Sequence, residues 1–296
     1  MTLLSDKVKE VRKLVDIELD KLLPLPTVPE KRVVEAMRYA SIGGGKALRP
    51  LLLISTAEMF GVSPEKSIRV ATALEMIHSY SLIHDDLPAM DDDDLRRGKP
   101  SCHKAFDEAT AILAGDGLLT RAFEILAAEQ TPLDPAVRCE LITALGAAAG
   151  ARGMVGGQML DLMAETDLEM TMTDVIRLQS QKTGRLLGFA CEAGAILGKA
   201  TFEERQALKN YASDIGLTFQ ITDDILDIEG AVEKVGKSLR RDIDCNKVTF
   251  VSLVGVDKAK EKARELTDHA VAELEIFGER AEILHELAEF ILSRDH

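Results

Sequence analysis

Apolar residues recur at spacings of three and four along most of this chain, the pattern of helices that bury one face. Leu74 and Ile77 follow this spacing, and so do Ile215 and Phe219. Two segments, residues 71–84 and 184–197, are apolar or small almost all round. Helices of that kind are buried on every side, so these two are predicted to lie centrally.

Helix-breaking residues divide the chain at intervals that suit a series of helices. No low-complexity tract, long linker or fixed-period repeat separates it into parts. We therefore predict an all-α fold in which residues 1–296 form a single domain. The predicted breaks fall at residues 24–26, 42–45, 61–64, 131–132, 167–173, 198 and 229–230.

The composition agrees with this pattern and limits the partners. The 296 residues are 46% hydrophobic with no Trp and only 4% aromatics, which favours helices over strands. A formal charge of −14 argues against binding to nucleic acid or to an anionic membrane surface, because both draw on clustered Lys and Arg. An anionic substrate is nevertheless expected, since a bound metal ion inverts the local charge of an acidic site.

The cysteines and the N-terminal segment bear on location. The four cysteines are widely spaced and form no C-x-x-C pair, so we expect free thiols rather than a zinc or redox motif. Residues 1–20 lack the apolar centre of a signal peptide, and no apolar run approaches the length of a membrane span. We expect a cytoplasmic protein without a membrane span. The cysteines are Cys102, Cys139, Cys191 and Cys245.

Two aspartate clusters lie about half a chain apart, DDLPAMDDDD at residues 85–94 and DDILD at residues 223–227. Each ends an otherwise apolar stretch, where a carboxylate is costly unless a cation neutralises it. Magnesium is usually held by one or two protein carboxylates, with water and substrate phosphate completing its octahedron. The clusters therefore predict an enzyme that binds a phosphate-bearing substrate through shared Mg²⁺.

The first cluster needs a break in its helix to work as a metal site. Pro88 disfavours the α conformation in the residue before it, so the helix should end near Asp86 and release Asp91 into a loop. In a continuous helix, residues six apart would point away from each other. The break therefore allows Asp85 and Asp91 to converge.

The second cluster needs no break. Asp223 and Asp227 are four residues apart and share one helix face, where like charges repel unless a cation lies between them. For either cluster alone, a solvated acidic surface is an equally good explanation. The two clusters together, with their apolar flanks, favour metal binding.

Basic residues outside these runs offer partners for phosphate. Lys46 and Arg49 follow three glycines, 43–45, whose backbone N–H groups could cradle an anion. Arg96 and Arg97 directly follow the first acidic cluster, and a guanidinium suits bidentate contact with phosphate. Isolated lysines among polar or small residues are more often surface residues than ligands. Three of this kind are Lys182, Lys237 and Lys247.

Together these motifs resemble those of the trans-isoprenyl diphosphate synthases, and most closely the bacterial farnesyl diphosphate synthases. The resemblance spans nearly the whole chain. The four-residue spacer of the first acidic motif is the one seen in bacterial farnesyl synthases and in many geranylgeranyl synthases. The matching segments are GGGKALRP (43–50), HSYSLIHDDLPAMD (78–91), RRGKP (96–100), GGQ (156–158) with Asp161, KTG (182–184) and FQITDDILD (219–227).

The resemblance implies a fold and a reaction. The fold is a single-domain barrel or bundle of mostly antiparallel helices around a deep central cavity, usually as a homodimer, with the acidic motifs facing each other across the mouth. The reaction is the Mg²⁺-dependent condensation of isopentenyl diphosphate with the allylic substrates, dimethylallyl and geranyl diphosphate. The product is (E,E)-farnesyl diphosphate, and three Mg²⁺ ions are expected with bound diphosphate.

The resemblance also implies residue roles. The metal ligands are Asp85, Asp91, Asp223 and Asp227. The residues expected to act in catalysis are Lys182, Thr183, Gln220, Asp86 and Asp224, of which Thr183 and Gln220 face the developing cation. The allylic diphosphate contacts Arg96, Lys182 and Lys247, and Lys237 helps to close the site. Isopentenyl diphosphate contacts Lys46, Arg49, His78 and Arg97, although a lone His on an apolar face is more often a core residue.

Product length is implied by Tyr80 and Ser81, which resemble residues that form the cavity floor in the family. Five helical residues place Tyr80 roughly 7.5 Å below the metal site. A bulky Tyr there is expected to stop growth at C15; the alternative is a geranylgeranyl synthase, with Tyr80 simply a buried core residue. Arg240 and Asn246 stand where the family commonly has glycines, so loop closure around them is expected to differ.

Two other classes compete with this interpretation. A terpene cyclase shares aspartate-bound magnesium and an apolar cavity, but it has no need of a second diphosphate site, so Lys46, Arg49 and Arg97 speak against it. A non-catalytic helical metal-binding subunit would explain the acidic clusters but not the basic residues. A catalytically inactive subunit would also be expected to have lost one aspartate motif, and both motifs are intact here.

Overall fold

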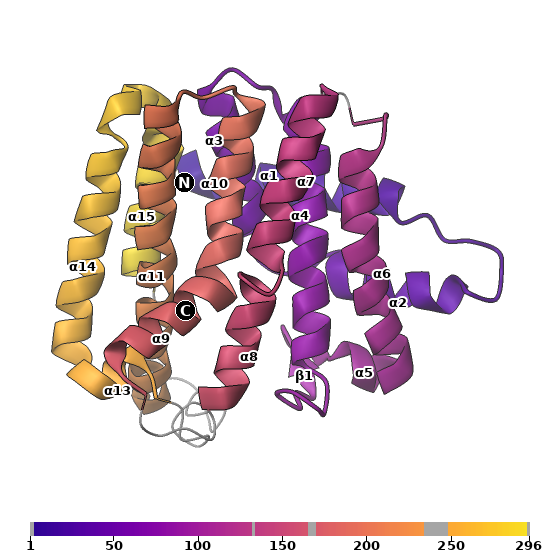
Figure 1. Ribbon diagram of the computed structural model, residues 1–296. Coiled ribbons are helices and arrows are strands. Elements are labelled where there is room, and N and C mark those ends of the chain that lie inside the picture. Colours follow the sequence, from indigo (N-terminus) through magenta and orange to yellow (C-terminus); the bar gives the residue numbers. More distant parts are fainter. Residues whose placement is uncertain (1–2, 132–133, 165–169, 234–247, 295–296) are drawn as a thin grey trace. The chain divides into compact units, whose positions relative to one another are not determined.

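The computed structural model describes residues 3–131, 134–164, 170–233 and 248–294, and they are almost entirely helical (Figure 1). The predicted all-α class is confirmed. The chain divides into two compact units, Met1–Ala144 with Ile196–Gly198, and Leu145–Ala195 with Lys199–His296. The single domain over residues 1–296 stays a prediction.

The first unit is built around α4, which is buried along most of its length. It packs against α3 and α6, and α6 also contacts α2; Figure 1 shows α4 beside α6. The burial of α4 confirms the expectation that segment 71–84 is central. The helices of this unit are α1 (Leu3–Leu22), α2 (Lys31–Ser41), α3 (Leu48–Met59), α4 (Pro64–Asp85), α5 (Cys102–Ala105) and α6 (Glu108–Ala127).

A small antiparallel hairpin follows the first acidic motif. Strand β1 (Leu95–Arg96) pairs with β2 (Lys99–Pro100), so that Arg96 lies opposite Lys99. The two turn residues, Arg97 and Gly98, both have positive φ, +55° and +74°. Positive φ at both central positions is the type I′ geometry that matches the twist of a two-residue hairpin.

The second unit centres on the long helix α11, which packs against α14 (Figure 1). Its core includes Ile221 and Ile225 of α11 with Phe250 and Val251 of α13. The elements of this unit are α8 (Met154–Ala164), α9 (Met172–Gln179), η1 (Ser180–Gly184), α11 (Phe202–Glu233), α13 (Phe250–Val254), α14 (Val256–Glu273), η3 (Glu275–Ala281) and α15 (Glu282–Ser293). The division falls within α7 (Pro135–Ala149) and near the end of α10 (Arg185–Leu197).

Most predicted helix breaks agree with the observed boundaries, and one is wrong. Helix α4 ends at Asp85, as expected from Pro88. The break predicted at residues 229–230 is wrong, because α11 continues to Glu233. A single glycine costs a helix only about 1 kcal/mol relative to Ala, which the packing of a long helix can offset.

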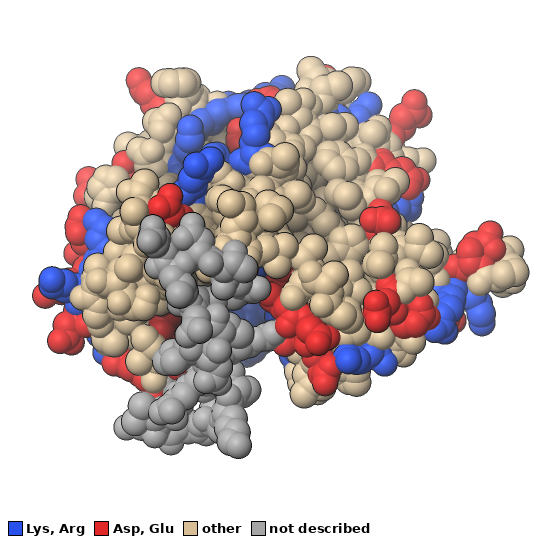
Figure 2. Space-filling model, turned by 60° about the horizontal axis from the view of Figure 1, so that its bottom comes forward, with Lys and Arg blue, Asp and Glu red and all other residues tan. Residues whose placement is uncertain are grey.

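The surface and the cysteines match the composition. On the face shown in Figure 2, basic side chains stand in separate groups rather than in one continuous band. Cys102, Cys139 and Cys191 are free thiols, and Cys245 lies outside the described residues. Within the described ranges, every helix is too short or too polar to cross a bilayer.

Candidate active site

The first acidic motif folds back on itself directly after α4. The backbone N–H of Asp91 donates to the carbonyl oxygen of Asp85 at 2.9 Å, and Asp93 N–H donates to Asp86 O at 3.1 Å. This loop brings the backbones of Asp85 and Asp91 together, as the break at Pro88 predicts. Carboxylate oxygens presented from a closed loop are suitable ligands for a hard cation such as Mg²⁺.

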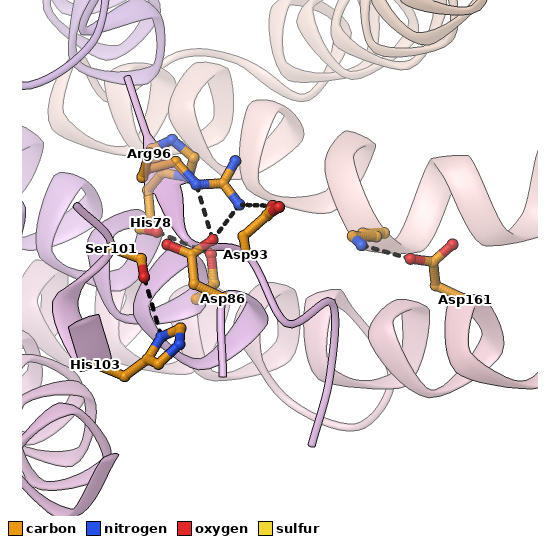
Figure 3. Close-up of polar contacts among 9 residues, drawn as sticks. His78, Asp86, Asp93, Arg96, Ser101, His103 and Asp161 are labelled. Atoms are coloured by element: carbon orange, nitrogen blue, oxygen red, sulfur yellow. Dashed lines mark hydrogen bonds and ion pairs between the residues drawn. The ribbon is translucent and has the colours of Figure 1, made fainter. Parts of the chain in front are cut away.

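Arg96 holds this motif from the hairpin. The Nε atom of Arg96 donates to Asp86 Oδ1 at 2.9 Å, and its Nη2 atom contacts the same oxygen (Figure 3). Nη2 also lies 3.3 Å from Asp93 Oδ2. Burial raises the pKa of Asp86, although Arg96 opposes this rise. Burial also disfavours the charge of Arg96, but Asp86 and Asp93 outweigh it and raise the pKa of the guanidinium. Asp86 is therefore an anchor for Arg96 as well as a part of the acidic motif.

Arg97 points to a different partner, the glycine loop. Gly43 and Gly45 have φ of +72° and +69°, a conformation that L side chains rarely adopt. At Gly44 the space for a larger side chain is limited, because a Cβ there would lie 2.2 Å from Nη1 of Arg97. The guanidinium of Arg97 thus lies against the backbone of the loop.

Arg49 and His78 meet beside this loop. Arg49 Nη1 lies 3.3 Å from His78 Nε2, and because a guanidinium can only donate, Nε2 is the acceptor. Burial, together with the charges of Arg49 and Arg97, holds the pKa of His78 well below its usual value, so the ring is neutral. Burial also lowers the pKa of Arg49 to about 10. Lys46 is exposed and precedes α3, which begins at Leu48.

A pocket of about 280 Å³ lies within the first unit, between the glycine loop, the hairpin and the end of α4. The glycine loop forms one part of its lining, and the hairpin arginines and the end of α4 form another. The arginines and the glycine backbone in this lining are suited to binding an anion, because guanidinium and backbone N–H groups both donate hydrogen bonds. The lining residues that matter here are Gly43, Gly44, Gly45, Asp86, Arg96 and Arg97.

The second acidic motif lies on α11. Asp224 Oδ2 accepts from Gln179 Nε2 at 3.2 Å and from the backbone N–H of Phe250 at 3.1 Å. Asp223 Oδ1 pairs with Arg294 at 2.6 Å. Asp227 lies one turn further along the same helix, and Gln220 is partly buried on it. The placement of Asp223 and Asp227 on one continuous helix agrees with their spacing, whereas the facing of the two acidic motifs stays a prediction.

Lys182 and Thr183 lie in a π-helical turn, η1, between α9 and α10. Lys182 Nζ donates to Asp161 Oδ2 of α8 at 2.6 Å (Figure 3). Gly157 permits this contact, because a Cβ there would lie 2.1 Å from the backbone nitrogen of Lys182. Turns of this kind are rare and occur frequently at functional sites.

One further acidic group bears on metal binding. Oxygen atoms of Asp92 and Asp94 and a ring nitrogen of His103 lie within 4.8 Å of one another, so this group could hold a metal ion. Asp94 also pairs with Lys104 at 2.8 Å, and Ser101 contacts His103 Nδ1 at 3.1 Å. These residues adjoin the predicted ligands Asp85 and Asp91 without being the same set.

Comparison with known proteins shows the family to which the chain belongs. Residues 30–287 match the polyprenyl synthetase family. The chain belongs to this family. The farnesyl diphosphate synthase of Bacillus subtilis (strain 168) is 42% identical over 294 residues, covering 99% of this chain and 97% of that protein.

Two further relatives show the range of the family. The crystal structure of an FPP/GFPP synthase from Zymomonas mobilis has a TM-score of 0.90 and 49% identity, covering 98% of this chain and 99% of that one. The chloroplastic geranylgeranyl pyrophosphate synthase of Capsicum annuum is 41% identical over 271 residues, 91% of this chain and 73% of its own. The predicted family and the predicted trans-prenyltransferase activity are confirmed.

Tyr80, the predicted floor residue of this polyprenyl synthetase, is buried in α4 at 5% exposure. Its ring packs edge to face on His84, with centroids 5.7 Å apart, and burial raises the pKa of its hydroxyl to about 12. Ser81 is partly buried, and its hydroxyl donates to the carbonyl oxygen of His78 at 2.8 Å. Lys237 and Lys247 lie outside the described residues, and so do Arg240 and Asn246.

The sequence analysis missed several polar residues that support the polyprenyl synthetase site. Glu75 had a visible signal, since a carboxylate within an almost wholly apolar helix must be paired when it is buried. The others make contacts that no local pattern encodes. They are Arg12, Asp16 and Arg294.

Proposed function

We propose that this polyprenyl synthetase is a farnesyl diphosphate synthase. It condenses isopentenyl diphosphate with dimethylallyl diphosphate and then with geranyl diphosphate, giving (E,E)-farnesyl diphosphate. Ionisation of the allylic C–O bond yields an allylic cation, the double bond of isopentenyl diphosphate attacks it, and a proton is lost. The observation that carries the proposal is the pocket of the first unit, where two adjacent arginines contact two different elements, the acidic motif and the glycine loop.

Isopentenyl diphosphate is assigned to the glycine-loop side of this pocket. Arg97 supplies positive charge from the pocket lining, and Lys46 and Arg49, which are outside that lining, are assigned to the same substrate. Gly44 and Gly45 are assigned as the backbone N–H donors, since the Gly43 N–H donates to Asp16. His78 is neutral and accepts from Arg49 through Nε2, so its role is to orient Arg49. A second diphosphate site distinct from the acidic motif is what a condensation of two diphosphates requires.

The allylic diphosphate is assigned to the acidic motifs. Asp85 and Asp91, with Asp223 and Asp227, would hold Mg²⁺, and the closed backbone loop between Asp85 and Asp91 fits that role. When bound, the three ions expected would neutralise the charge that develops on the leaving diphosphate. Arg96, Lys182 and Lys247 add positive charge at the same diphosphate, with Asp86 and Asp224 in support and Lys237 closing the site.

The allylic cation must be stabilised by nearby polar atoms and protected from water. Thr183 and Gln220 are assigned to face the cation, where their oxygen atoms stabilise positive charge. Water must be excluded because it would trap the cation as an alcohol. The departing diphosphate is assigned as the acceptor of the proton, since no side-chain base stands out in these motifs.

The direct test is product analysis. Purified protein is incubated with Mg²⁺, isopentenyl diphosphate and dimethylallyl diphosphate, and the dephosphorylated prenols are identified by gas chromatography–mass spectrometry. Farnesol as the main product is expected. Geranylgeraniol as the main product would support the condensation reaction but refute the C15 limit on product length. Folded protein that forms no prenol would refute the synthase proposal and favour a non-catalytic subunit.

We also propose a homodimer and a cytoplasmic location. The exposed apolar side chains of Ile112 and Leu113 on α6 support self-association, because they leave apolar surface on one helix uncovered. Light scattering coupled to size-exclusion chromatography tests the dimer, and a monomer across the micromolar range would refute it. Fractionation of cells with the prenol assay on each fraction tests the location.

A further inference from the structure

The glycine loop at residues 43–45 is held by two side chains of α1. Asp16 Oδ1 accepts from the backbone N–H of Gly43 at 3.0 Å. Arg12 Nη1 donates to the carbonyl oxygen of Gly44 and lies 3.3 Å from that of Gly45. Three successive loop residues are therefore bonded through their backbone to a single turn of one distant helix.

These two side chains also bind each other. Arg12 Nε lies 3.1 Å from Asp16 Oδ2, and Arg12 Nη2 lies 2.8 Å from Asp16 Oδ1. The pair is bidentate, spans four residues of one helix, and is mostly buried, with side-chain exposures of 16% and 30%. A bidentate guanidinium–carboxylate pair fixes the orientation of both groups, so each is pre-positioned for its loop partner.

A third carboxylate ties this pair to the pocket. Glu75 of α4 is 2% exposed, and its Oε1 lies 4.0 Å from Arg12 Nη1. Burial raises the pKa of Glu75, while the charges of Arg49, Arg12 and Arg97 oppose that rise. Arg12 thus neutralises part of the buried charge beneath the loop, and it does so alongside two arginines that are assigned to substrate.

We propose that Arg12 and Asp16 form a positioning pair that sets the affinity for isopentenyl diphosphate by fixing the glycine loop. This inference rests on the proposed function, because that function assigns the loop, Lys46 and Arg97 to isopentenyl diphosphate. Arg12 and Asp16 bind loop backbone and each other, so they act through the loop and not as substrate ligands. The allylic diphosphate is assigned to groups that the pair does not contact.

The proposal predicts a selective effect on one Michaelis constant. In Arg12→Ala, KM for isopentenyl diphosphate should rise by about tenfold to 100-fold, the range for a lost hydrogen bond to a charged group. KM for geranyl diphosphate and kcat at saturating isopentenyl diphosphate should change less than about twofold. Asp16→Ala should behave like Arg12→Ala, and Asp16→Asn should be milder, since Asn still accepts from Gly43 N–H.

Arg38→Ala is the matched control. Arg38 of α2 likewise bonds a backbone carbonyl, that of Leu23 at 2.7 Å, and a carboxylate, that of Asp20, but it lies away from the glycine loop in these contacts. The Arg38→Ala variant should lose about as much thermal stability as Arg12→Ala, while both of its Michaelis constants stay at the wild-type values. If Arg12→Ala does not fold, the two Michaelis constants are compared in Arg12→Lys and Asp16→Asn instead.

The outcomes separate this inference from the proposed function. Wild-type protein that forms no prenol would refute the function itself. If the wild type is active, equal changes in both Michaelis constants for the Arg12 and Asp16 variants would refute the positioning role. Unchanged constants would refute it as well. A selective rise for isopentenyl diphosphate that Asp16→Asn partly reverses relative to Asp16→Ala would establish it.

Discussion

The backbone N–H of Asp91 bonds to the carbonyl oxygen of Asp85 at 2.9 Å, although six residues separate them. This hydrogen bond closes the loop through the main chain, without using either carboxylate. This main-chain contact between the two predicted ligands does not require their side-chain charge, so we expect it to persist when one charge is removed.

Asp91→Asn should therefore separate catalysis from folding. We expect prenol formation to fall by roughly 100-fold or more, because one negative ligand of the metal site is lost, while the thermal midpoint changes little. Steady-state rates at several Mg²⁺ concentrations and a thermal melt measure the two effects. Glu108→Gln, which alters an exposed carboxylate of α6 outside both acidic motifs, is the control, and an equal loss of rate in it would contradict the assignment of Asp91.

Gly44→Ala should weaken binding at the pocket with little effect on folding. The new Cβ would lie 2.2 Å from Arg97 Nη1, the mobile end of a long side chain, so Arg97 can move aside. We expect KM for isopentenyl diphosphate to rise by about tenfold, as for loss of one charged hydrogen bond. Gly146→Ala, where a Cβ meets nothing within 4 Å, is the control and should leave KM unchanged.

Tyr80→Ala should lengthen the product. Removing a ring that is 5% exposed opens space on the face of α4 that is assigned as the cavity floor. We expect geranylgeraniol or longer prenols after dephosphorylation, whereas Tyr80→Phe keeps the bulk and should still give farnesol. An unchanged C15 product from a folded Tyr80→Ala protein would show that another residue limits chain growth.

Gly157→Ala should destabilise the second unit. A Cβ at this position would lie 2.1 Å from the backbone nitrogen of Lys182, and backbone cannot move aside as a side chain can. We expect a loss of about 1–3 kcal/mol in the free energy of unfolding, measured with urea. Gly188→Ala is the matched helical control, because nothing lies within 4 Å of its Cβ, and it should be neutral or stabilising.

Asp107 should contribute an acid-sensitive part of the stability. It caps α6 by accepting from Thr110 N–H at 2.8 Å and pairs with Arg32 at 2.8 Å; hydrogen bonds from Arg32 and Thr110 lower its pKa from 3.8 to about 2. Because the folded pKa is the lower one, this stabilisation is present above pH 4 and is lost as the pH falls toward 2.

The measurement for Asp107 is urea unfolding of the wild type and Asp107→Asn between pH 2 and pH 6. The difference in unfolding free energy should be largest above about pH 4 and should shrink toward pH 2. A constant difference across the whole range would mean that the cap acts without its charge.

The sequence predicts the elements of the site better than the contacts that support them. Pro88 was sufficient to place the end of α4 at Asp85, because its effect on the preceding residue is local. The π turn holding Lys182 was not predictable, because the same residue types form α- and π-helical turns. The contacts of Arg12 and Asp16 depend on packing between segments some 30 residues apart, which no periodicity records.

The hairpin between β1 and β2 links the acidic motif to the glycine loop, the two elements that are proposed to bind the two diphosphates. Its two-residue turn fixes which of the adjacent arginines reaches the acidic motif and which reaches the glycine loop. Inserting or deleting one residue in this turn would change the direction in which the side chains of both arginines point. If the proposed assignments hold, product length can change through α4 alone, whereas a change in the register of this hairpin would disturb both diphosphate sites together.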